Sequence, residues 1–230
     1  MNMTQPICRY IDHAVLKPEM TPAEAAQQMR IGVDYHVRTI CVRPADIELA
    51  QRISDGSDTE VSCVLAFPHG DALRESKADE AKRYVDLGVA EIDMVVNYGL
   101  IRGGLWDRLE EDIRAVTDAA RPAKVKVKTI FETSALTLEQ IARATDIAVA
   151  AKADFVKTST GFGGGGTTIE AVQAMLTAAA GRIGVKASGG IRDRGTAEMY
   201  IAMGVARLGV GSATTPVLCD DARGSDAGGY

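Results

Sequence analysis

Short apolar runs alternate with longer amphipathic segments along nearly the whole chain. Eight of these runs have the aliphatic and β-branched composition of buried strands, and they end at intervals of roughly 30 residues, the length of one strand–helix unit. Eight such units in one chain favour an α/β fold with a single closed (β/α)8 (TIM) barrel over an open doubly wound sheet. The strands are predicted at Tyr10–His13, Thr39–Val42, Val61–Phe67, Glu91–Val96, Val125–Ile130, Phe155–Thr158, Gly184–Ser188 and Arg207–Gly211.

The segments between these runs carry helix signals. Thr21-Pro22-Ala23-Glu24 and Thr137-Leu138-Glu139-Gln140 have the pattern of capping boxes at helix starts. Gly88 and Gly204 follow helical runs, where a C-terminal cap is expected. No linker divides the chain, so we predict one barrel domain over residues 1–219. The polar, glycine-rich residues 220–230 are predicted to form a short flexible C-terminal tail.

Composition narrows the class of protein. The 230 residues are 46% hydrophobic and 25% charged, as in an ordinary globular domain. A net charge of −5 argues against a nucleic-acid partner, because binding to a phosphate backbone needs a concentrated basic surface. We find no apolar run of about 18 residues and no signal-peptide pattern, so we expect a cytoplasmic protein without a membrane partner.

Cysteine and histidine usage bears on metals and disulfides. The four cysteines are widely spaced without a C-x-x-C pair, and the three histidines are scattered. This pattern is typical of reduced thiols and offers no zinc cluster. We expect no metal at the site, although a carboxylate magnesium site is not excluded by these counts.

Ionisable residues end four consecutive predicted strands: Asp93, Lys128, Lys157 and Lys186. Active sites of such barrels lie at the C-terminal ends of the strands. A lysine with its usual pKa near ~10.4 is a poor nucleophile, but desolvation and a neighbouring cation free its amine. Lys157 beside Lys186 therefore suggests imine chemistry. The alternative is that both lysines extend to solvent from the strand ends.

Glycine-rich turns lie at the ends of the last three predicted strands, at Gly161–Gly166, Gly189-Gly190 and Gly209–Ser212. Such turns at helix starts expose backbone N–H groups that bind anions, and barrels frequently hold phosphate after strands 7 and 8. A single glycine loop would indicate only a tight turn. Three together predict a small phosphorylated substrate.

Other polar residues leave alternatives open. His69 would line the barrel mouth or be an incidental loop residue. Cys41 ends the second predicted strand and would face the site or pack as a small core residue. Asp12 and Lys17 flank the first predicted strand, either as a local ion pair or as part of the rim.

The motifs together resemble the deoxyribose-phosphate aldolase family. The resemblance runs in order from about Ile11 to Ser212 and rests on several distinctive segments. These are Ile11–Pro18, Ile40–Pro44, Val64–Gly70, Glu91–Asn97, Lys128–Thr133, Lys157–Gly161 and Val185–Gly190.

The resemblance implies a class I aldolase without cofactor or metal. It would reversibly cleave 2-deoxy-D-ribose 5-phosphate to D-glyceraldehyde 3-phosphate and acetaldehyde, in deoxynucleoside catabolism. Lys157 would form the imine, Lys186 would lower its pKa, Asp93 would relay protons and Lys128 would contact that aspartate. The phosphate would bind at Gly161, Gly189, Gly190, Gly211 and Ser212.

Several positions depart from the commonest family pattern. Ala14 stands where threonine is frequent, Thr129 where an aliphatic residue is usual, and Lys126 where the residue is usually apolar. Cys41 and Thr158 are candidate pocket residues. Some family members end in a mobile tyrosine that assists proton transfer, a role that Tyr230 would take here.

Three other functions fit the same residues in part. A pyridoxal-phosphate barrel also needs an imine lysine and an anion loop. A phosphosugar isomerase would use carboxylate bases, and a non-catalytic barrel would only bind the sugar. A homodimer is expected as the commonest oligomer.

Overall fold

The computed structural model describes residues 5–220 and contains a closed barrel of eight parallel strands in the order β1 to β8. β1 pairs with β8, which closes the sheet on itself. The predicted (β/α)8 barrel is therefore confirmed. The strands span β1 Ile11–Val15, β2 Thr39–Val42, β3 Glu60–Leu65, β4 Glu91–Val95, β5 Lys126–Ile130, β6 Phe155–Lys157, β7 Gly184–Ser188 and β8 Arg207–Gly211.

Most predicted strands lie where the structure has them, and β2, β7 and β8 agree at both ends. The third strand was predicted too long: it ends at Leu65, because Ala66 takes a left-handed conformation with φ of 51°. The first strand was predicted too short, and it continues to Val15. Asp12 thus lies within β1, not beside it.

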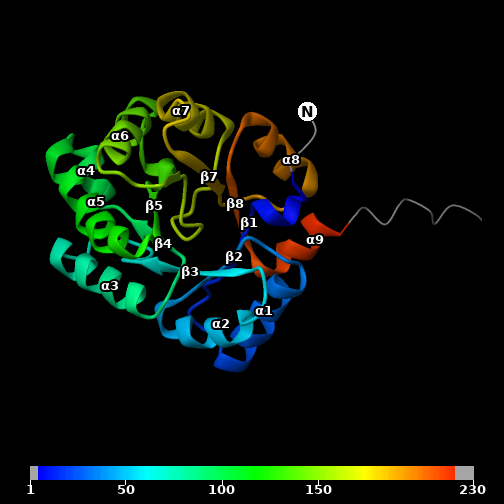
Figure 1. Cartoon of the computed structure of the whole chain (residues 1–230). Helices are drawn as coiled ribbons and strands as arrows, with labels where there is room; N and C mark the ends of the chain where they lie inside the picture. The colour runs from blue at the N-terminus through cyan, green and yellow to red at the C-terminus, as the bar shows by residue number, and fades with distance from the viewer. Residues whose placement is uncertain (1–4, 221–230) are drawn as a thin grey trace, which may run out of the picture.

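Helices form an outer ring around the strands (Figure 1). Both predicted capping boxes are present, at Thr21 and Thr137, and Gly204 ends a helix with φ of 109°. The α-helices span α1 Pro22–Asp34, α2 Ile47–Ser54, α3 Arg74–Asp86, α4 Tyr98–Arg102, α5 Trp106–Ala120, α6 Leu138–Ala150, α7 Ile169–Ala179, α8 Arg194–Met203 and α9 Thr215–Cys219. Short 3-10 helices cover η1 Ile7–Tyr10, η2 Pro44–Asp46, η3 Arg121–Ala123, η4 Thr133–Ala135 and η5 Ser212–Thr214.

The strands bury different chemistry on their two faces. Residues such as Ile92, Met94 and Val127 belong to the hydrophobic core shared with the helices. The alternate residues Asp93 and Lys128 are fully buried and contact each other, so this face points into the barrel. The barrel interior is consequently polar, whereas the layer between sheet and helices is apolar.

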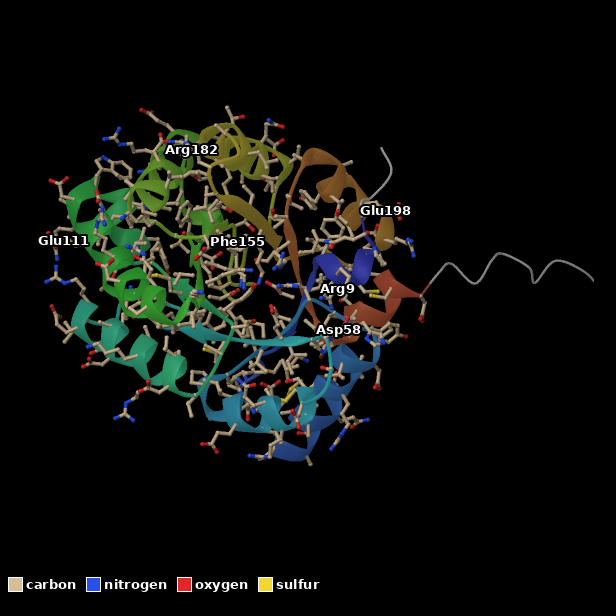
Figure 2. The ribbon with its side chains drawn as sticks, viewed as in Figure 1. Arg9, Asp58, Glu111, Phe155, Arg182 and Glu198 are labelled. Carbon is tan, nitrogen blue, oxygen red and sulfur yellow. The ribbon has the colours of Figure 1, made fainter. Side chains whose placement is uncertain are left out.

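The outer surface carries most of the remaining charge. Figure 2 shows Glu111, Arg182 and Glu198 at the periphery, with Phe155 near the centre of the barrel. Within residues 5–220, no helix has the length and apolar character that a membrane crossing requires.

Candidate active site

The four ionisable residues predicted at the strand ends meet inside the barrel around one carboxylate. The Nζ atoms of Lys157 and Lys186 lie 2.8 Å and 2.7 Å from Oδ2 of Asp93. Lys128 Nζ donates to Oδ1 of the same carboxylate at 2.7 Å. All four side chains are nearly or completely buried. The parallel register places Asp93 opposite Lys128 and Lys157 opposite Lys186, with Lys157 two residues beyond Phe155, the partner of Lys128.

Asp12 of β1 joins this cluster, which the sequence did not predict. Its Oδ2 accepts a hydrogen bond from Lys186 Nζ at 2.5 Å and lies 3.3 Å from Lys128 Nζ. Asp12 is fully buried and Lys17 is exposed, so the suggested local ion pair between them was wrong. The predicted strand Tyr10–His13 contained Asp12, but the two roles suggested for it were a local ion pair and a place at the rim, and neither is a contact with Lys128 and Lys186 inside the barrel.

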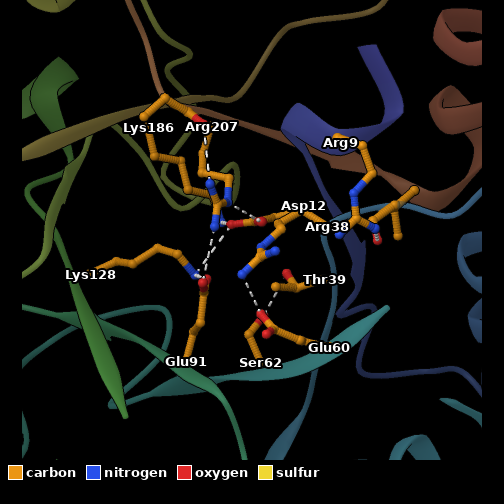
Figure 3. A network of polar contacts seen from close by, with 12 residues as sticks. Arg9, Asp12, Arg38, Thr39, Glu60, Ser62, Glu91, Lys128, Lys186 and Arg207 are labelled. Carbon is orange, nitrogen blue, oxygen red and sulfur yellow. Dashed lines mark hydrogen bonds and ion pairs between the residues drawn. The ribbon is translucent and has the colours of Figure 1, made fainter. Parts of the chain in front are cut away.

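A second layer of charge lies beneath, toward the N-terminal ends of the strands (Figure 3). Glu91 of β4 contacts Lys128 Nζ at 2.5 Å and accepts a hydrogen bond from Arg207 of β8 at 3.1 Å. Lys126, whose side chain is 42% exposed, lies 3.8 Å from Glu91 at this lower end. Within the cluster the carboxylates thus come from β1 and β4, and the cations from β5 to β8.

The surroundings separate the three lysines electrostatically. Burial lowers the pKa of Lys157, with Lys186 adding to the effect and Asp93 opposing it. Burial acts on Lys186 too, but Asp12 and Asp93 outweigh it and raise the pKa of Lys186. The same carboxylates with Glu91 hold the pKa of Lys128 well above its usual value. Lys157 is therefore the amine of this cluster that most readily loses its proton.

Asp93 remains ionised despite complete burial. Burial raises its pKa, but the ammonium groups of Lys128, Lys157 and Lys186 outweigh that effect and hold the pKa far below the usual range. The carboxylate is thus a permanent acceptor beside the Lys157 amine.

A cavity of about 590 Å³ opens above the cluster. Lys157, Lys186, Asp12 and Cys41 line its floor side. The five predicted phosphate-binding residues all line the same cavity, namely Gly161, Gly189, Gly190, Gly211 and Ser212. The structure therefore brings the lysine pair and the glycine turns to one space.

Backbone geometry explains two of these glycines. Gly189 and Gly190 follow β7 with φ of 91° and 84°, a region that other residues rarely adopt. Gly189 also faces Gly166 closely, since a Cβ on Gly166 would lie 2.8 Å from the Gly189 oxygen. The two turns after β6 and β7 thus pack backbone against backbone beside the cavity.

The two candidate pocket residues differ in placement. Cys41 lines the cavity, and burial raises the pKa of its thiol, which keeps it uncharged. Thr158 is fully buried outside the cavity lining, so its suggested pocket position was wrong. Its Oγ1 donates to the Ser188 oxygen and accepts from the Ser188 N–H, both at 3.0 Å. Thr158 therefore ties β6 to β7.

Glu132 belongs to a segment that carries the family resemblance, but the sequence analysis assigned it no role at the site. It takes a left-handed conformation with φ of 55° after β5. Its Oε2 accepts hydrogen bonds from Thr160 Oγ1 at 2.5 Å and from Thr160 N–H at 3.1 Å. Glu132 thereby holds the turn after β6, and the family segment that contains it was the only sequence signal that could have pointed to this role.

The remaining sequence expectations fall outside the lysine cluster. Ala14 lines the cavity, whereas Thr129 is buried and donates to the Phe155 oxygen. His69 lines a separate small cavity near Glu80. Tyr230 lies outside the described residues.

No metal cluster is evident in the part of the chain that the structure describes. There, no group of three or more histidine, cysteine, aspartate or glutamate side chains is arranged to hold a metal ion. The carboxylates of the cluster instead contact ammonium or guanidinium groups.

Comparisons with known proteins agree with this geometry. The deoxyribose-phosphate aldolase of Geobacillus sp. is 42% identical over 215 residues, covering 94% of this chain and 96% of that protein. The solved aldolase QR15 superimposes with a TM-score of 0.86 at 36% identity, over 92% of this chain and 94% of its own. A tetrameric deoxyribose phosphate aldolase from Aeropyrum pernix gives 0.82 at 27% identity, over 92% and 89%. The model of the DeoC/LacD family aldolases matches residues 7–207, and the chain belongs to this family.

Proposed function

We propose that this protein is a class I aldolase that reversibly cleaves 2-deoxy-D-ribose 5-phosphate to D-glyceraldehyde 3-phosphate and acetaldehyde. One observation carries the proposal: the buried Lys157 amine, whose pKa is lowered, contacts Asp93 at 2.8 Å and opens onto a cavity lined by glycine turns. Family membership supports it, since relatives are named deoxyribose-phosphate aldolases.

The first chemical step is imine formation at Lys157. The neutral amine attacks the C1 aldehyde of the open-chain sugar, and loss of water gives a protonated imine. The protonated imine is cationic, and the adjacent Asp93 carboxylate stabilises it. Lys186 keeps its own proton because two carboxylates raise its pKa, so it does not compete as a nucleophile.

Carbon–carbon cleavage follows. A base removes the C3 hydroxyl proton, the C2–C3 bond breaks, and its electron pair moves into the protonated imine to give an enamine. Asp93 is the carboxylate within reach of Lys157, and we assign it this proton relay, directly or through a water. D-Glyceraldehyde 3-phosphate leaves, C2 of the enamine is protonated, and hydrolysis releases acetaldehyde and Lys157.

The glycine turns would orient the substrate. Gly161, Gly189, Gly190, Gly211 and Ser212 line the cavity, and the backbone N–H groups of such turns suit a phosphate dianion. Anchoring the phosphate there would place the far end of the sugar, which carries C1, toward Lys157.

We also propose a cytoplasmic homodimer acting in deoxynucleoside catabolism, with the barrel at residues 1–219 followed by a tail. The Aeropyrum pernix relative is described as a tetramer, so light scattering of the purified protein decides between the two states. We retain Tyr230 as an assistant in proton transfer, to be tested by its deletion.

Trapping of the imine tests the proposal directly. The protein is incubated with deoxyribose 5-phosphate or acetaldehyde, reduced with borohydride, digested and analysed by mass spectrometry. We expect a stable adduct on Lys157 that is lost in Lys157→Ala. The exposed Lys124 provides the control, and Lys124→Ala should keep the adduct.

Other outcomes would identify the alternatives. A visible absorbance band in the purified protein would indicate pyridoxal phosphate. Substantial turnover by Lys157→Ala would indicate an isomerase that uses carboxylate bases. Binding of the sugar phosphate without an adduct or turnover would leave a non-catalytic binding protein.

A further inference from the structure

The buried cluster inside the barrel has equal numbers of opposite charges when one lysine is neutral. Its carboxylates are Asp12, Glu91 and Asp93, and the three cations that stay protonated are Lys128, Lys186 and Arg207. Each of these residues is at most 9% exposed. Lys157 is then the additional amine, and its protonation would leave an uncompensated positive charge in the interior.

Arg207 completes this balance from the lower layer, away from the cavity. Its guanidinium donates to Glu91 Oε1 at 3.1 Å and stacks over the Phe155 ring at 5.2 Å. Its Nε lies 3.4 Å from Asp12 Oδ1, but neither atom makes a hydrogen bond. The contact between Arg207 and Asp12 is therefore Coulombic and not directional.

Arg207 and Glu91 do not line the substrate cavity. They act on it through intermediates, because Arg207 contacts Asp12, which binds Lys186, and Glu91 contacts Lys128, which binds Asp93. Figure 3 shows Arg207 between Asp12 and Glu91. Any effect of Arg207 and Glu91 on Lys157 must therefore be electrostatic and not a result of contact with the substrate.

We propose that Arg207 and Glu91 are positioning residues that set the protonation state of Lys157 from beneath the site. This inference rests on the proposed imine chemistry of Lys157. Arg207 favours the neutral amine, since it supplies the third cation, and Glu91 opposes it. Neither residue touches the reacting atoms.

The groups that face Lys157 are consistent with this assignment. They are Asp93 from β4, Lys186 from β7 and the uncharged thiol of Cys41 from β2, with Lys128 and Asp12 next to them. Lys126 is half-exposed, so solvent screens its charge. Within the described residues, Asp93, Lys128, Glu91 and Arg207 are the buried charged groups of the cluster outside the cavity lining. Of these four, only Glu91 and Arg207 form no ion pair with Lys157 or with Asp93.

The test measures the pH at which Lys157 becomes reactive. Acetaldehyde and cyanoborohydride are added across a pH series, and the initial rate of adduct formation at Lys157 is followed by mass spectrometry. Arg207→Met should move the rising limb of this profile up by about one pH unit. Glu91→Gln should move it down by a similar amount, since a buried unit charge shifts the pKa of a nearby group by about one unit.

Opposite shifts distinguish charge balance from structural damage, which would lower the rate at every pH without moving the limb. The double variant Arg207→Met/Glu91→Gln removes one charge of each sign and should return the limb to within a few tenths of a unit of the original. Arg207→Lys keeps the positive charge and should leave the rising limb at its original pH.

Arg38 offers a matched control at the same end of the barrel. It pairs with Glu60 at 2.9 Å, apart from the contacts that lead to Lys157 (Figure 3). Arg38→Met should leave the limb unchanged. If the variants fold and form the adduct with an unshifted limb, or if both single changes shift it in the same direction, the inference is overturned. Absence of any adduct in the unaltered protein would instead contradict the proposed function.

Discussion

Three chemically identical side chains acquire different properties from the number of carboxylates they contact. Lys157 contacts Asp93 alone, Lys186 contacts Asp93 and Asp12, and Lys128 contacts those two and Glu91. Burial penalises all three ammonium groups, and each added carboxylate offsets more of that penalty. The pKa is accordingly lowered for Lys157 and raised for the other two. The nucleophile is the lysine with the fewest partners.

Substitution of Gly209 tests how far the position of the Lys186 side chain affects catalysis. A Cβ on Gly209 would lie 2.6 Å from Ser188 Cβ and 3.1 Å from Lys186 Cε. Gly209→Ala must displace Lys186 relative to Lys157, and we expect kcat to fall by about tenfold or more, because small displacements of catalytic groups are costly. Steady-state kinetics measure this effect.

Gly195 of α8 supplies the control for that substitution. A Cβ there would approach Asp193 Oδ1 no closer than 3.4 Å, an ordinary contact. Gly195→Ala should keep full activity. Unchanged kcat in Gly209→Ala would show that the interior accommodates the added methyl group without moving Lys186.

The short strand β6 depends on hydroxyl contacts to hold the turn that follows it. Thr158 bonds to the Ser188 backbone of β7, and Ser188 Oγ donates to the Ser159 oxygen at 2.5 Å. Thr160 bonds to Glu132, which follows β5. These contacts attach the glycine turn after β6 to both neighbouring strands, so the turn is fixed beside the cavity.

Removing one hydroxyl should loosen this turn. Thr160→Val keeps the volume of the side chain but removes the donor to Glu132 and the acceptor for the Phe162 N–H. A buried carboxylate that loses a partner costs about 1–3 kcal/mol. We expect KM for deoxyribose 5-phosphate to rise by about tenfold with kcat nearly retained, as measured by initial rates.

An exposed hydroxyl provides the comparison. On α7, the exposed Thr177 hydroxyl accepts a hydrogen bond from the exposed Gln173 side chain. Thr177→Val should therefore leave KM unchanged. If Thr160→Val lowers kcat and leaves KM unaltered, the turn positions the reacting atoms and does not hold the phosphate.

The sequence allowed much of this architecture to be predicted because the inward faces of the strands in a barrel converge. Asp93, Lys128 and Lys186 lie in the middle of their strands and not at the predicted strand ends, and Lys157 ends β6, but closure of the barrel brings the four together. Contacts across the barrel were not predictable. Glu91 and Arg207 are 116 positions apart, and no local pattern reports their ion pair. Thr158 was misplaced because it neighbours Lys157 in sequence, although alternation turns its side chain to the other face.

At the scale of the whole molecule, His13 joins the barrel to its helical ring. Its Nδ1 lies 2.8 Å from Thr215 Oγ1 of α9, and its Nε2 lies 2.8 Å from the Gln28 oxygen of α1. The side chain is fully buried on the face of β1 opposite to Asp12. Burial lowers its pKa to about 4, so the folded protein holds it neutral under ordinary conditions.

This depressed pKa makes stability sensitive to acid. In the unfolded state, His13 has a pKa of about 6.5 and binds a proton below that pH, whereas in the folded state it stays neutral down to about pH 4. The free energy of unfolding therefore falls as the pH drops from about 6.5 to 4. The loss between pH 7 and pH 5 should be about 2 kcal/mol. Urea unfolding at these two pH values measures it.

A non-titrating residue at this position should remove part of that dependence. His13→Gln is expected to be less stable at pH 7 but to lose less on acidification. His36 is exposed and pairs with Asp58, so His36→Gln should keep the original dependence. Equal losses in all three proteins would assign the acid sensitivity to other groups.

The division of charge between the two halves of the barrel bears on how these halves associate during folding. The carboxylates of the interior lie on β1 and β4, and the lysines and Arg207 on β5 to β8. Either half alone would bury charges of one sign without counterions, which is strongly unfavourable. Two copies of the same half would repel each other, whereas the unlike halves attract.

A chain divided between Ala123 and Lys124, in the exposed connection before β5, should therefore behave as a complementary pair. Each fragment alone should remain unfolded, and the mixture should regain the circular dichroism of the barrel at a rate that falls as salt is added. Independent folding of either fragment would contradict this expectation. The charges that lower the pKa of Lys157 would then also direct the association of one half of the barrel with the other.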